Sequence, residues 1–492
     1  MRVKIQIFLL ICGWVMCGGA IGSVVVYPGL PNNQYGSELY EVTVAQAGKS
    51  LPSYVYKSSR ETGKSMGKPT GITTDANHWT SFSFSGGITV QIKLRDGTAV
   101  KTAIVRPLAK NIHAEVSNDT VSFTLTEPAN VFVELDGKPR DPLFIFANPV
   151  ENNIPTKAAT NVIYFGPGVT DLGRQPLQVA DGQTVYLAGG AYVKGRIQAA
   201  SSTGDKAVTI CGRGILSGID IAERRGVFGQ FMISDSVRRK DSILPSAASQ
   251  LHVEGIVITD PPGPSLNTRN RLTAENIKLL AWPMCTDGIS GGEDSLVKDC
   301  FLKVNDDGLH FHRSGTKLIN NVVWRQSFGS AIQMGWNRAQ NVEGELCDGL
   351  DIIGDDTGRL NIEKDWGNAN VVALMDIHKH ATYRNIVIAN VRHEKRSSQL
   401  FGVRTMLAAE DINHTSFRDG RGSVEGMVFR NITALQKPSN PSVFDGNGRE
   451  PGSINNVTFE NIRIAGELIT DENAAGYIVQ RGKTFGFNYH AN

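Results

Sequence analysis

Between residue 24 and about residue 155, apolar and polar side chains alternate in short runs. The clearest runs are 81–84, 88–92, 121–125 and 131–135. A period of two places every second side chain on one face of a β-strand, which is typical of a sheet that buries one face. Gly, Asp and Asn residues separate the runs and favour turns. The pattern therefore predicts an antiparallel β-sandwich in this part of the chain.

From about residue 250 the pattern becomes a repeated unit, in which Asn, Asp or Gly stands just before a mostly β-branched apolar residue. Four such units are 254–258, 275–279, 298–302 and 320–324, and their third residues lie 21, 23 and 22 positions apart. The same theme returns at 384–386, 430–432 and 460–462. Self-similarity at a nearly fixed spacing indicates a solenoid, in which each repeat packs on its neighbours.

Leucine-rich repeats share this period, but the leucine framework that they need is missing here. Short runs of Val, Ile, Thr and Phe favour strands instead, so a right-handed parallel β-helix fits better. In such a coil the strands of successive turns pair at about 4.8 Å, and equivalent residues form columns. Residues 184–193 and 208–214 are its predicted first turns. The predicted fold is all-β: an N-terminal β-sandwich over 23–157, followed by a right-handed parallel β-helix over 158–492, with the join near 151–157.

Residues 1–22 have the three parts of a secretory signal peptide. A positive charge at residues 1–4 precedes an apolar run at 5–17, and small residues follow at 18–20. A membrane anchor needs about 18 or more apolar residues in a row, and this run is shorter. A lipid anchor at Cys17 is a minor alternative, because the residue before it is large. We therefore expect a secreted protein, extracellular or periplasmic, with no membrane association after the signal is removed.

Composition narrows the class of partner. Lys and Arg total 50 and Asp and Glu total 48, so a net charge of +2 gives no electrostatic case for nucleic acid or an anionic membrane. A neutral polysaccharide partner and a monomeric protein are expected. The cysteines beyond the leader are Cys211, Cys285, Cys300 and Cys347, and disulfides and buried thiols both remain open. Their spacing lacks the Cys-x-x-Cys pattern of a zinc site, so we expect no metal and no cofactor.

Three aspartates gather in the solenoid part of the chain. Asp287 lies in Thr-Asp-Gly, and the adjacent pair Asp306 and Asp307 begins nineteen residues later. In a coil of about 22 residues per turn, this offset brings all three onto one face. Like charges in one site raise at least one pKa, and a protonated carboxyl beside ionised ones is what an acid/base hydrolase requires. A lone Asp-Gly is more often a turn cap, but His310 and His312, which are either structural or ligands of the carboxylates or a sugar, favour a catalytic role.

Candidate substrate contacts lie on later turns. Gln333 and Trp336 follow in the next turn. An amide can bond to sugar hydroxyls and an indole can stack on a sugar ring, although an indole packed in the interior is an equal alternative. Lys364 and Trp366 could line the same cleft, and a solvated loop explains them as well.

Several motifs resemble, in order and spacing, those of the glycoside hydrolase family that contains dextranase and isopullulanase. They are Cys-Thr-Asp-Gly at 285–288, Val-Asn-Asp-Asp-Gly at 304–308, Ser-Gly at 314–315 and Ile-Gln-Met-Gly-Trp at 332–336. The resemblance is specific over about residues 285 to 340 and general elsewhere. It implies a β-sandwich followed by a right-handed β-helix, and cleavage of an α-glucosidic linkage inside a glucan such as dextran or pullulan.

Carried over to this chain, the resemblance implies that Asp306 is the general acid and that Asp287 and Asp307 together activate the attacking water in an inverting reaction. Polygalacturonases have a similar aspartate trio, followed by Gly-His-Gly and Arg-Ile-Lys, and neither tripeptide occurs here. This absence argues against pectin as the substrate. The alternatives are a hydrolase of another glycan, a polysaccharide lyase, and a non-catalytic carbohydrate-binding solenoid whose carboxylates are structural or bind calcium.

Overall fold

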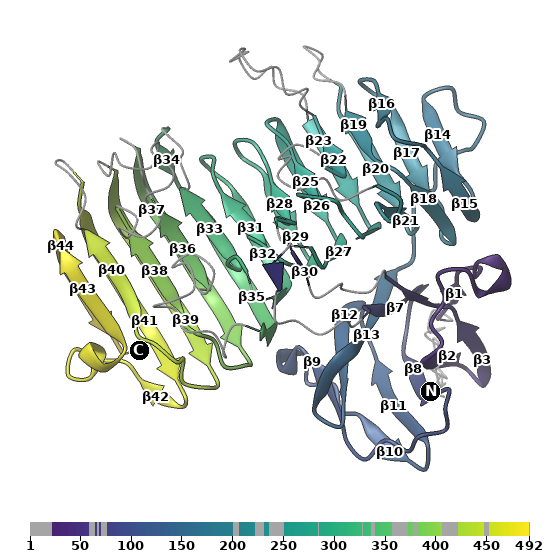
Figure 1. The fold of residues 1–492 in the computed structure, drawn as a ribbon, viewed down its shortest axis with the longest axis horizontal. Coiled ribbons are helices and arrows are strands. Elements are labelled where there is room, and N and C mark those ends of the chain that lie inside the picture. Colours follow the sequence, from purple (N-terminus) through teal and green to yellow (C-terminus); the bar gives the residue numbers. More distant parts are fainter. Residues whose placement is uncertain are drawn as a thin grey trace, which may run out of the picture.

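The computed structural model is all-β, as predicted, and consists of two units (Figure 1). It describes residues 22–491 except 59–63, 66–67, 70–75, 200–205, 222–230, 236–249, 284, 327, 336–339, 357–371, 377–380, 406–421 and 447–451. The predicted signal peptide lies outside the described residues apart from Gly22. Within the described ranges, helical structure consists of the short 3-10 helices η1 (Pro31–Asn33), η2 (Leu108–Lys110) and η6 (Ala474–Gly476), and no helix there is long and apolar enough to cross a membrane.

The first unit is the predicted β-sandwich. One sheet contains β1 (Val24–Val26), β7 (His78–Phe84), β13 (Lys138–Pro149), β12 (Ala129–Leu135) and β9 (Ala103–Arg106), with β4 (Val55–Lys57) also paired to β7. The other contains β10 (Glu115–Ser117), β11 (Thr120–Leu125), β8 (Ile88–Leu94), β2 (Tyr40–Gln46) and β3 (Lys49–Ser53). A separate pair joins β5 (Lys64–Ser65) to β6 (Lys68–Pro69).

Alternation along β8 shows why the sandwich forms. Ile88, Val90 and Ile92 are buried in its core, whereas Gln91 and Lys93 are exposed. The pairing departs from the antiparallel prediction at one place, because β7 and β13 run parallel. These two strands are far apart in the chain, and the connection between them crosses to the other sheet, so it can return in either direction.

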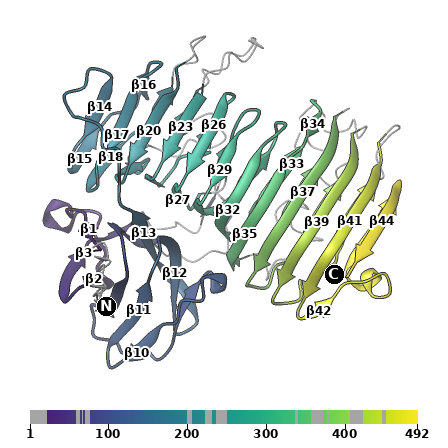
Figure 2. The same cartoon turned by 180° about the vertical axis from the view of Figure 1, so that it is seen from behind.

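The second unit is a parallel β-helix (Figures 1 and 2). Its larger sheet contains β14 (Val162–Phe165), β15 (Gly168–Asp171), β17 (Thr184–Leu187), β18 (Ala191–Lys194), β20 (Val208–Gly212), β21 (Ile215–Ser217), β23 (Gln250–Glu254), β24 (Val257–Thr259), β26 (Arg271–Glu275), β27 (Lys278–Leu280), β29 (Leu296–Lys298), β30 (Phe301–Val304), β32 (Lys317–Arg325), β34 (Val342–Glu343), β35 (Leu346–Asp355), β37 (Thr382–His393), β39 (Ser423–Ala434), β41 (Ile454–Ile464), β42 (Glu467–Leu468) and β44 (Thr484–His490). Its second sheet contains β16 (Leu177–Val179), β19 (Ile197–Ala199), β22 (Ile233–Ser234), β25 (Leu266–Asn267), β28 (Ile289–Ser290), β31 (Leu309–Phe311), β33 (Ile332–Gly335), β36 (Ala373–Asp376), β38 (Phe401–Arg404), β40 (Ser442–Gly446) and β43 (Ile478–Gly482). The predicted join near 151–157 lies between β13 and β14.

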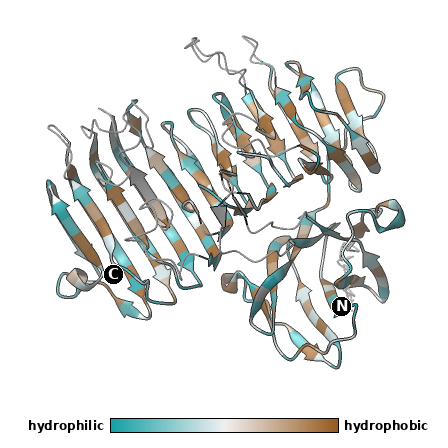
Figure 3. Cartoon of the chain, viewed as in Figure 1, coloured by the Kyte–Doolittle hydropathy of each residue, from teal (hydrophilic) through white to brown (hydrophobic). Residues whose placement is uncertain are grey.

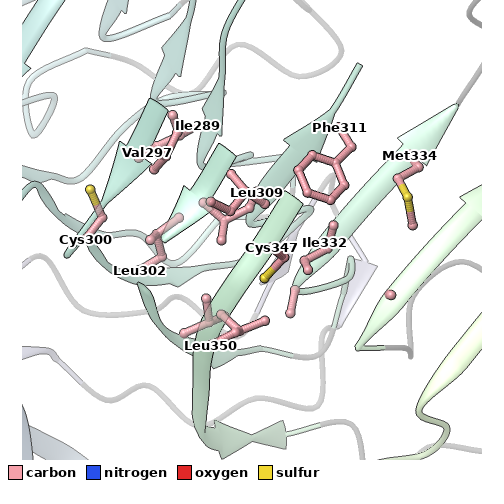
Figure 4. Packing of buried hydrophobic residues seen from close by; sticks show 14 of the residues in the cluster. Ile289, Val297, Cys300, Leu302, Leu309, Phe311, Ile332, Met334, Cys347 and Leu350 are labelled. Carbon is pink, nitrogen blue, oxygen red and sulfur yellow. The ribbon is translucent and has the colours of Figure 1, made fainter. Parts of the chain in front are cut away.

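Apolar side chains of successive turns stack inside the coil (Figure 4), and hydrophobic residues recur along its strands (Figure 3). Leu279, Leu302 and Val323 occupy paired positions and are buried, and their spacings of 23 and 21 residues agree with the predicted period. The later turns are longer, because Val323 pairs with Ile352 and Ile352 with His393, which lie 29 and 41 residues further on. The short period therefore applies only to the early turns, and later turns insert residues between their strands.

Asparagine and aspartate mark the bends of the coil. Asn276, Asp299 and Asn320 have φ of 51°, 55° and 52°, a left-handed conformation that these residue types tolerate better than others. The side chain of Asn431 donates to that of Asn390 on the neighbouring turn at 3.1 Å. Polar residues of the repeat therefore turn the chain, and on the later turns they also bond to their equivalents.

Cys211, Cys285, Cys300 and Cys347, the four cysteines in the described part of the chain, are not joined by disulfides. Cys300 and Cys347 are fully buried in the core of the β-helix (Figure 4). Burial raises the pKa of both thiols to about 12, so they pack as small apolar side chains. Of the two possibilities left open by the sequence, the structure contains thiols and not disulfides, and two of the four thiols are buried.

The sandwich packs on an outward-facing column of the larger sheet. By register, this column consists of Tyr192, Ile215, Val257, Lys278, Phe301 and Val322. The ring of Phe144 lies 5.0 Å from that of Phe301, and the ring of Phe132 lies 4.9 Å from that of Trp324. Apolar rings from both units thus form one shared cluster. The sandwich covers a surface that would otherwise expose large apolar side chains to water.

A buried group of charges also joins the two units. Arg106 on β9 contacts Glu134 and Glu394 at 2.6 Å each, and these three side chains are only 8%, 6% and 3% exposed. Replacing Arg106 with methionine is expected to lower the free energy of unfolding by about 3–5 kcal/mol, because Glu394 of the β-helix remains buried without its cation. Urea unfolding of the full chain measures this loss.

The matched control is Lys93→Met, which breaks a contact between Lys93 and Asp119 whose side chains are about half exposed. An exposed pair contributes below about 1 kcal/mol, so this variant should unfold close to the wild type. Equal losses in the two variants would contradict a stabilising role of the buried group at the interface.

Candidate active site

The register of the second sheet places Asp287 and Asp307 at equivalent positions on neighbouring turns. Ile289 pairs with Leu309, so the residues two positions before them also stand side by side. Backbone hydrogen bonds run from turn to turn beside the carboxylates: Gly288 N donates to Asp307 O at 2.9 Å, and Gly308 N donates to Ser330 O at 2.8 Å. Asp306 is adjacent to Asp307, and the charges of Asp287 and Asp307 both act on it, so the three carboxyl groups lie close together.

Two glycines allow this close stacking. A Cβ on Gly288 would come within 2.1 Å of the carbonyl oxygen of Gly308, and one on Gly329 would come within 2.0 Å of the carbonyl carbon of Asp306. Gly329 also has a φ of +79°, which other residues adopt rarely. The backbone of the segment that carries Asp306 and Asp307 is therefore in close contact with the backbone of the turns before and after it.

The three carboxyl groups are partly accessible to solvent. The side chain of Asp287 is 31% exposed, and Asp306 and Asp307 are partly exposed. Leu309 and Phe311 on β31, which follow the pair, are buried in the core of the coil (Figure 4). The trio thus lies just before the strands of the second sheet and is neither fully buried nor fully exposed.

Asn305 holds the segment that carries the pair. Its backbone N–H donates to Thr286 Oγ1 at 3.1 Å, and its side-chain amide donates to the carbonyl oxygen of Trp282 at 2.8 Å. The indole N–H of Trp282 in turn donates to Ser58 Oγ of the sandwich at 3.1 Å. The backbone around the aspartates is therefore held by contacts that reach into the other unit.

The surroundings of Asp306 and Asp307 give the two carboxyl groups different pKa values. Burial, together with the negative charges of Asp287 and Asp307, raises the pKa of Asp306 well above its ordinary value, and backbone N–H groups of Asp307 and Cys285 oppose this only in part. Burial raises the pKa of Asp307 to about 6, while hydrogen bonds from Ser330 and the charge of Arg325 lower it. Ser330 donates through its hydroxyl at 2.7 Å and its N–H at 2.9 Å. Asp307 therefore ionises while Asp306 still holds its proton, which is the combination that general acid and base catalysis uses.

His310, His312 and Gln333 form a connected group beside Asp287. His310 Nε2 lies 3.9 Å from Asp287 Oδ2, and His310 Nδ1 lies 3.4 Å from His312 Nε2. His312 also bonds to the side-chain oxygen of Gln333. Gln333 is only 1% exposed, and its amide group also donates to the carbonyl of Met334. The structure thus brings Gln333 to the site as a support for His312, and the two histidines link Asp287 to the next turn.

The remaining predicted contacts, Trp336, Lys364 and Trp366, lie outside the described residues. Sequence reasoning missed Asn305, Ser330 and Arg325. A signal existed for Ser330, which follows Asp307 by 23 residues, one period of the repeat. In the described part of the chain, no group of three or more His, Cys, Asp or Glu side chains is arranged to hold a metal ion.

Comparisons with known proteins find a matching family model, related chains and a similar fold. Residues 21–133 match the model of the glycosyl hydrolase family 49 N-terminal Ig-like domain. The chain is 25% identical to isopullulanase from Aspergillus niger, over 91% of this chain and 89% of that protein. It is 24% identical to a dextranase from Arthrobacter globiformis, over 88% of this chain and 82% of that protein. The fold resembles Dex49A from Penicillium minioluteum with a TM-score of 0.72 at 18% identity, over 95% of this chain and 96% of that structure.

Proposed function

Because the chain is a glycoside hydrolase of the family that contains dextranase and isopullulanase, we propose that it is a secreted enzyme that hydrolyses internal linkages of an α-glucan, such as dextran or pullulan, with inversion. Action on α-glucans follows from the relatives as a group. Internal cleavage, inversion and secretion are proposed in addition.

One observation carries the proposal: Asp287, Asp306 and Asp307 lie close together on neighbouring turns and are partly accessible to solvent, with Asp306 more basic than Asp307. In the proposed reaction Asp306 donates its proton to the glycosidic oxygen as the bond from that oxygen to the anomeric carbon breaks. Asp307, with Asp287, takes a proton from the water that attacks the opposite face of the anomeric carbon. Exchange with solvent then returns the proton to Asp306 and removes it from the base.

His310 supports the base side of the site in this proposal. Its ring lies beside the Asp287 carboxylate, and the contact through His312 to Gln333 holds that ring in place. A fixed orientation of Asp287 matters because the attacking water must be aligned with the bond that breaks. Secretion rests on the charged, apolar and small segments of residues 1–22.

Proton NMR during digestion tests the stereochemistry. The purified protein is incubated with dextran and pullulan, and with pectin as a uronate control, and the products are sized. We expect shorter oligosaccharides from an α-glucan whose new reducing ends appear first as the β-anomer, because water attacks from the face opposite an α-linkage. An initial α-anomer would contradict inversion. New ultraviolet absorbance would indicate a lyase, and binding without products would indicate a non-catalytic solenoid.

A further inference from the structure

A second group of buried polar side chains lies at the ends of three neighbouring strands. It is close to the aspartate pair, because Arg325 stands in register with Val304, three residues before Asp307, and Ser330 on the chain that follows Arg325 bonds to Asp307. Arg325 ends β32, Asp355 ends β35 and His393 ends β37. Arg325 Nη1 lies 3.2 Å from Asp355 Oδ2, and His393 Nε2 lies 2.9 Å from the same oxygen. The three side chains are 2%, 0% and 1% exposed. The group is thus a connected chain of polar side chains that is almost completely shielded from water.

Stability alone is a poor explanation for this group. Removing a guanidinium and a carboxylate from water costs several kcal/mol per ion, and well-packed apolar side chains are often at least as stable. The same strands carry a second arginine and aspartate, Arg392 and Asp351, and there the arginine side chain is 40% exposed. The arginine of that pair is partly solvated, whereas Arg325 is not.

The charge of Arg325 acts on the active site. Burial lowers the pKa of Arg325, while the negative charges of Asp355 and Asp307 raise it. In the other direction, the guanidinium lowers the pKa of Asp307. The neighbouring carboxyl groups are Asp306 from the same segment and Asp287 from the preceding turn, and the charges of Asp287 and Asp307 raise the pKa of Asp306. Among the described residues, His310 lies beside Asp287, and Lys303 on β30 lies over the ring of Trp282.

We infer that Arg325 is a positioning residue that keeps Asp307 ionised as the catalytic base, and that Asp355 and His393 hold its guanidinium in place. The inference rests on the proposed function, because it assigns a task to a charge next to the proposed base. Burial raises the pKa of Asp307, so a nearby cation helps this carboxylate to stay ionised at the pH at which Asp306 is still protonated. Arg325 supplies that cation from a position where its own side chain is only 2% exposed.

The test is the pH dependence of kcat/KM on the α-glucan that the wild type degrades. The variant Arg325→Met with Asp355→Asn removes both opposite charges and leaves no lone buried ion. We expect the acidic limb of its profile to move up by about one pH unit, the lower end of the effect of a nearby opposite charge. At pH values below the limb this shift appears as a roughly tenfold loss of kcat/KM. Arg325→Lys, which keeps a cation, should move the limb less.

The matched control is Arg392→Met with Asp351→Asn on the same sheet, which should leave the limb in place. An unmoved limb in a folded Arg325→Met, Asp355→Asn protein would overturn the inference. If that protein does not fold, His393→Asn provides the readout: a limb displaced upward supports the inference, and an unmoved limb overturns it. A wild type that cleaves no α-glucan would instead overturn the proposed function, so the two failures are distinguishable.

Discussion

Replacing Asp306 with asparagine is expected to lower kcat on an α-glucan by about 10²- to 10⁴-fold, the usual contribution of a general acid. The amide has the same shape and can still accept the backbone N–H of Asp307, which donates to Asp306 Oδ1 at 3.0 Å. It cannot transfer a proton to the leaving oxygen. The release of reducing ends measures the loss, and substrate binding and thermal unfolding should change little.

Asp299→Asn is the matched control. Asp299 lies on the preceding bend with its side chain 49% exposed, and asparagine tolerates the same left-handed backbone. This variant should hydrolyse at the wild-type rate. Release of reducing ends at the original rate by the Asp306 variant would show that another group is the acid. A smaller loss on an oligosaccharide glycoside with an acidic phenol as leaving group would confirm the role, because such a group departs with little protonation.

Replacing Asp307 with asparagine is expected to produce a loss of similar size by removing the base. In the wild type the base works only when ionised. Because burial raises the pKa of Asp307 to about 6, kcat/KM should be full above that pH and should fall as pH decreases through it. At higher pH a second decline is expected when Asp306 loses its proton, so the profile is bell-shaped. The pH profile of initial rates measures both limbs.

In the Asp307 variant the residual activity should no longer show the acidic limb near pH 6, because the group that titrates there is gone. Asp287→Asn is the informative comparison. Asp287 is partly exposed and lies beside His310, so its loss should reduce the rate while the limb remains. If the acidic limb persists in the Asp307 variant and disappears in the Asp287 variant, Asp287 is the group that must be ionised and Asp307 assists it.

Some of this site is predictable because the coil repeats. A period near 22 residues, read from residues such as Ile256 and Ile277, implies that side chains about one period apart share a face. Asp287 and Asp307 meet that condition, and the structure places them in register. The same argument would have found Ser330. It does not find Asp355 and His393, because the later turns carry insertions of different lengths and their spacing follows no period.

Local patterns in the chain by themselves determined the all-β class, the alternating strands of the sandwich, the bends at Asn and Asp, and the proximity of the three aspartates. Each depends on residues a few positions, or one repeat, apart. The tertiary structure alone decided how the sandwich covers the column that contains Phe301, that Gln333 supports His312 and is not open to solvent, and which carboxyl keeps its proton. Burial and the charges of distant segments set these outcomes, since desolvation and Coulomb energy depend on distance in space and not on separation along the chain.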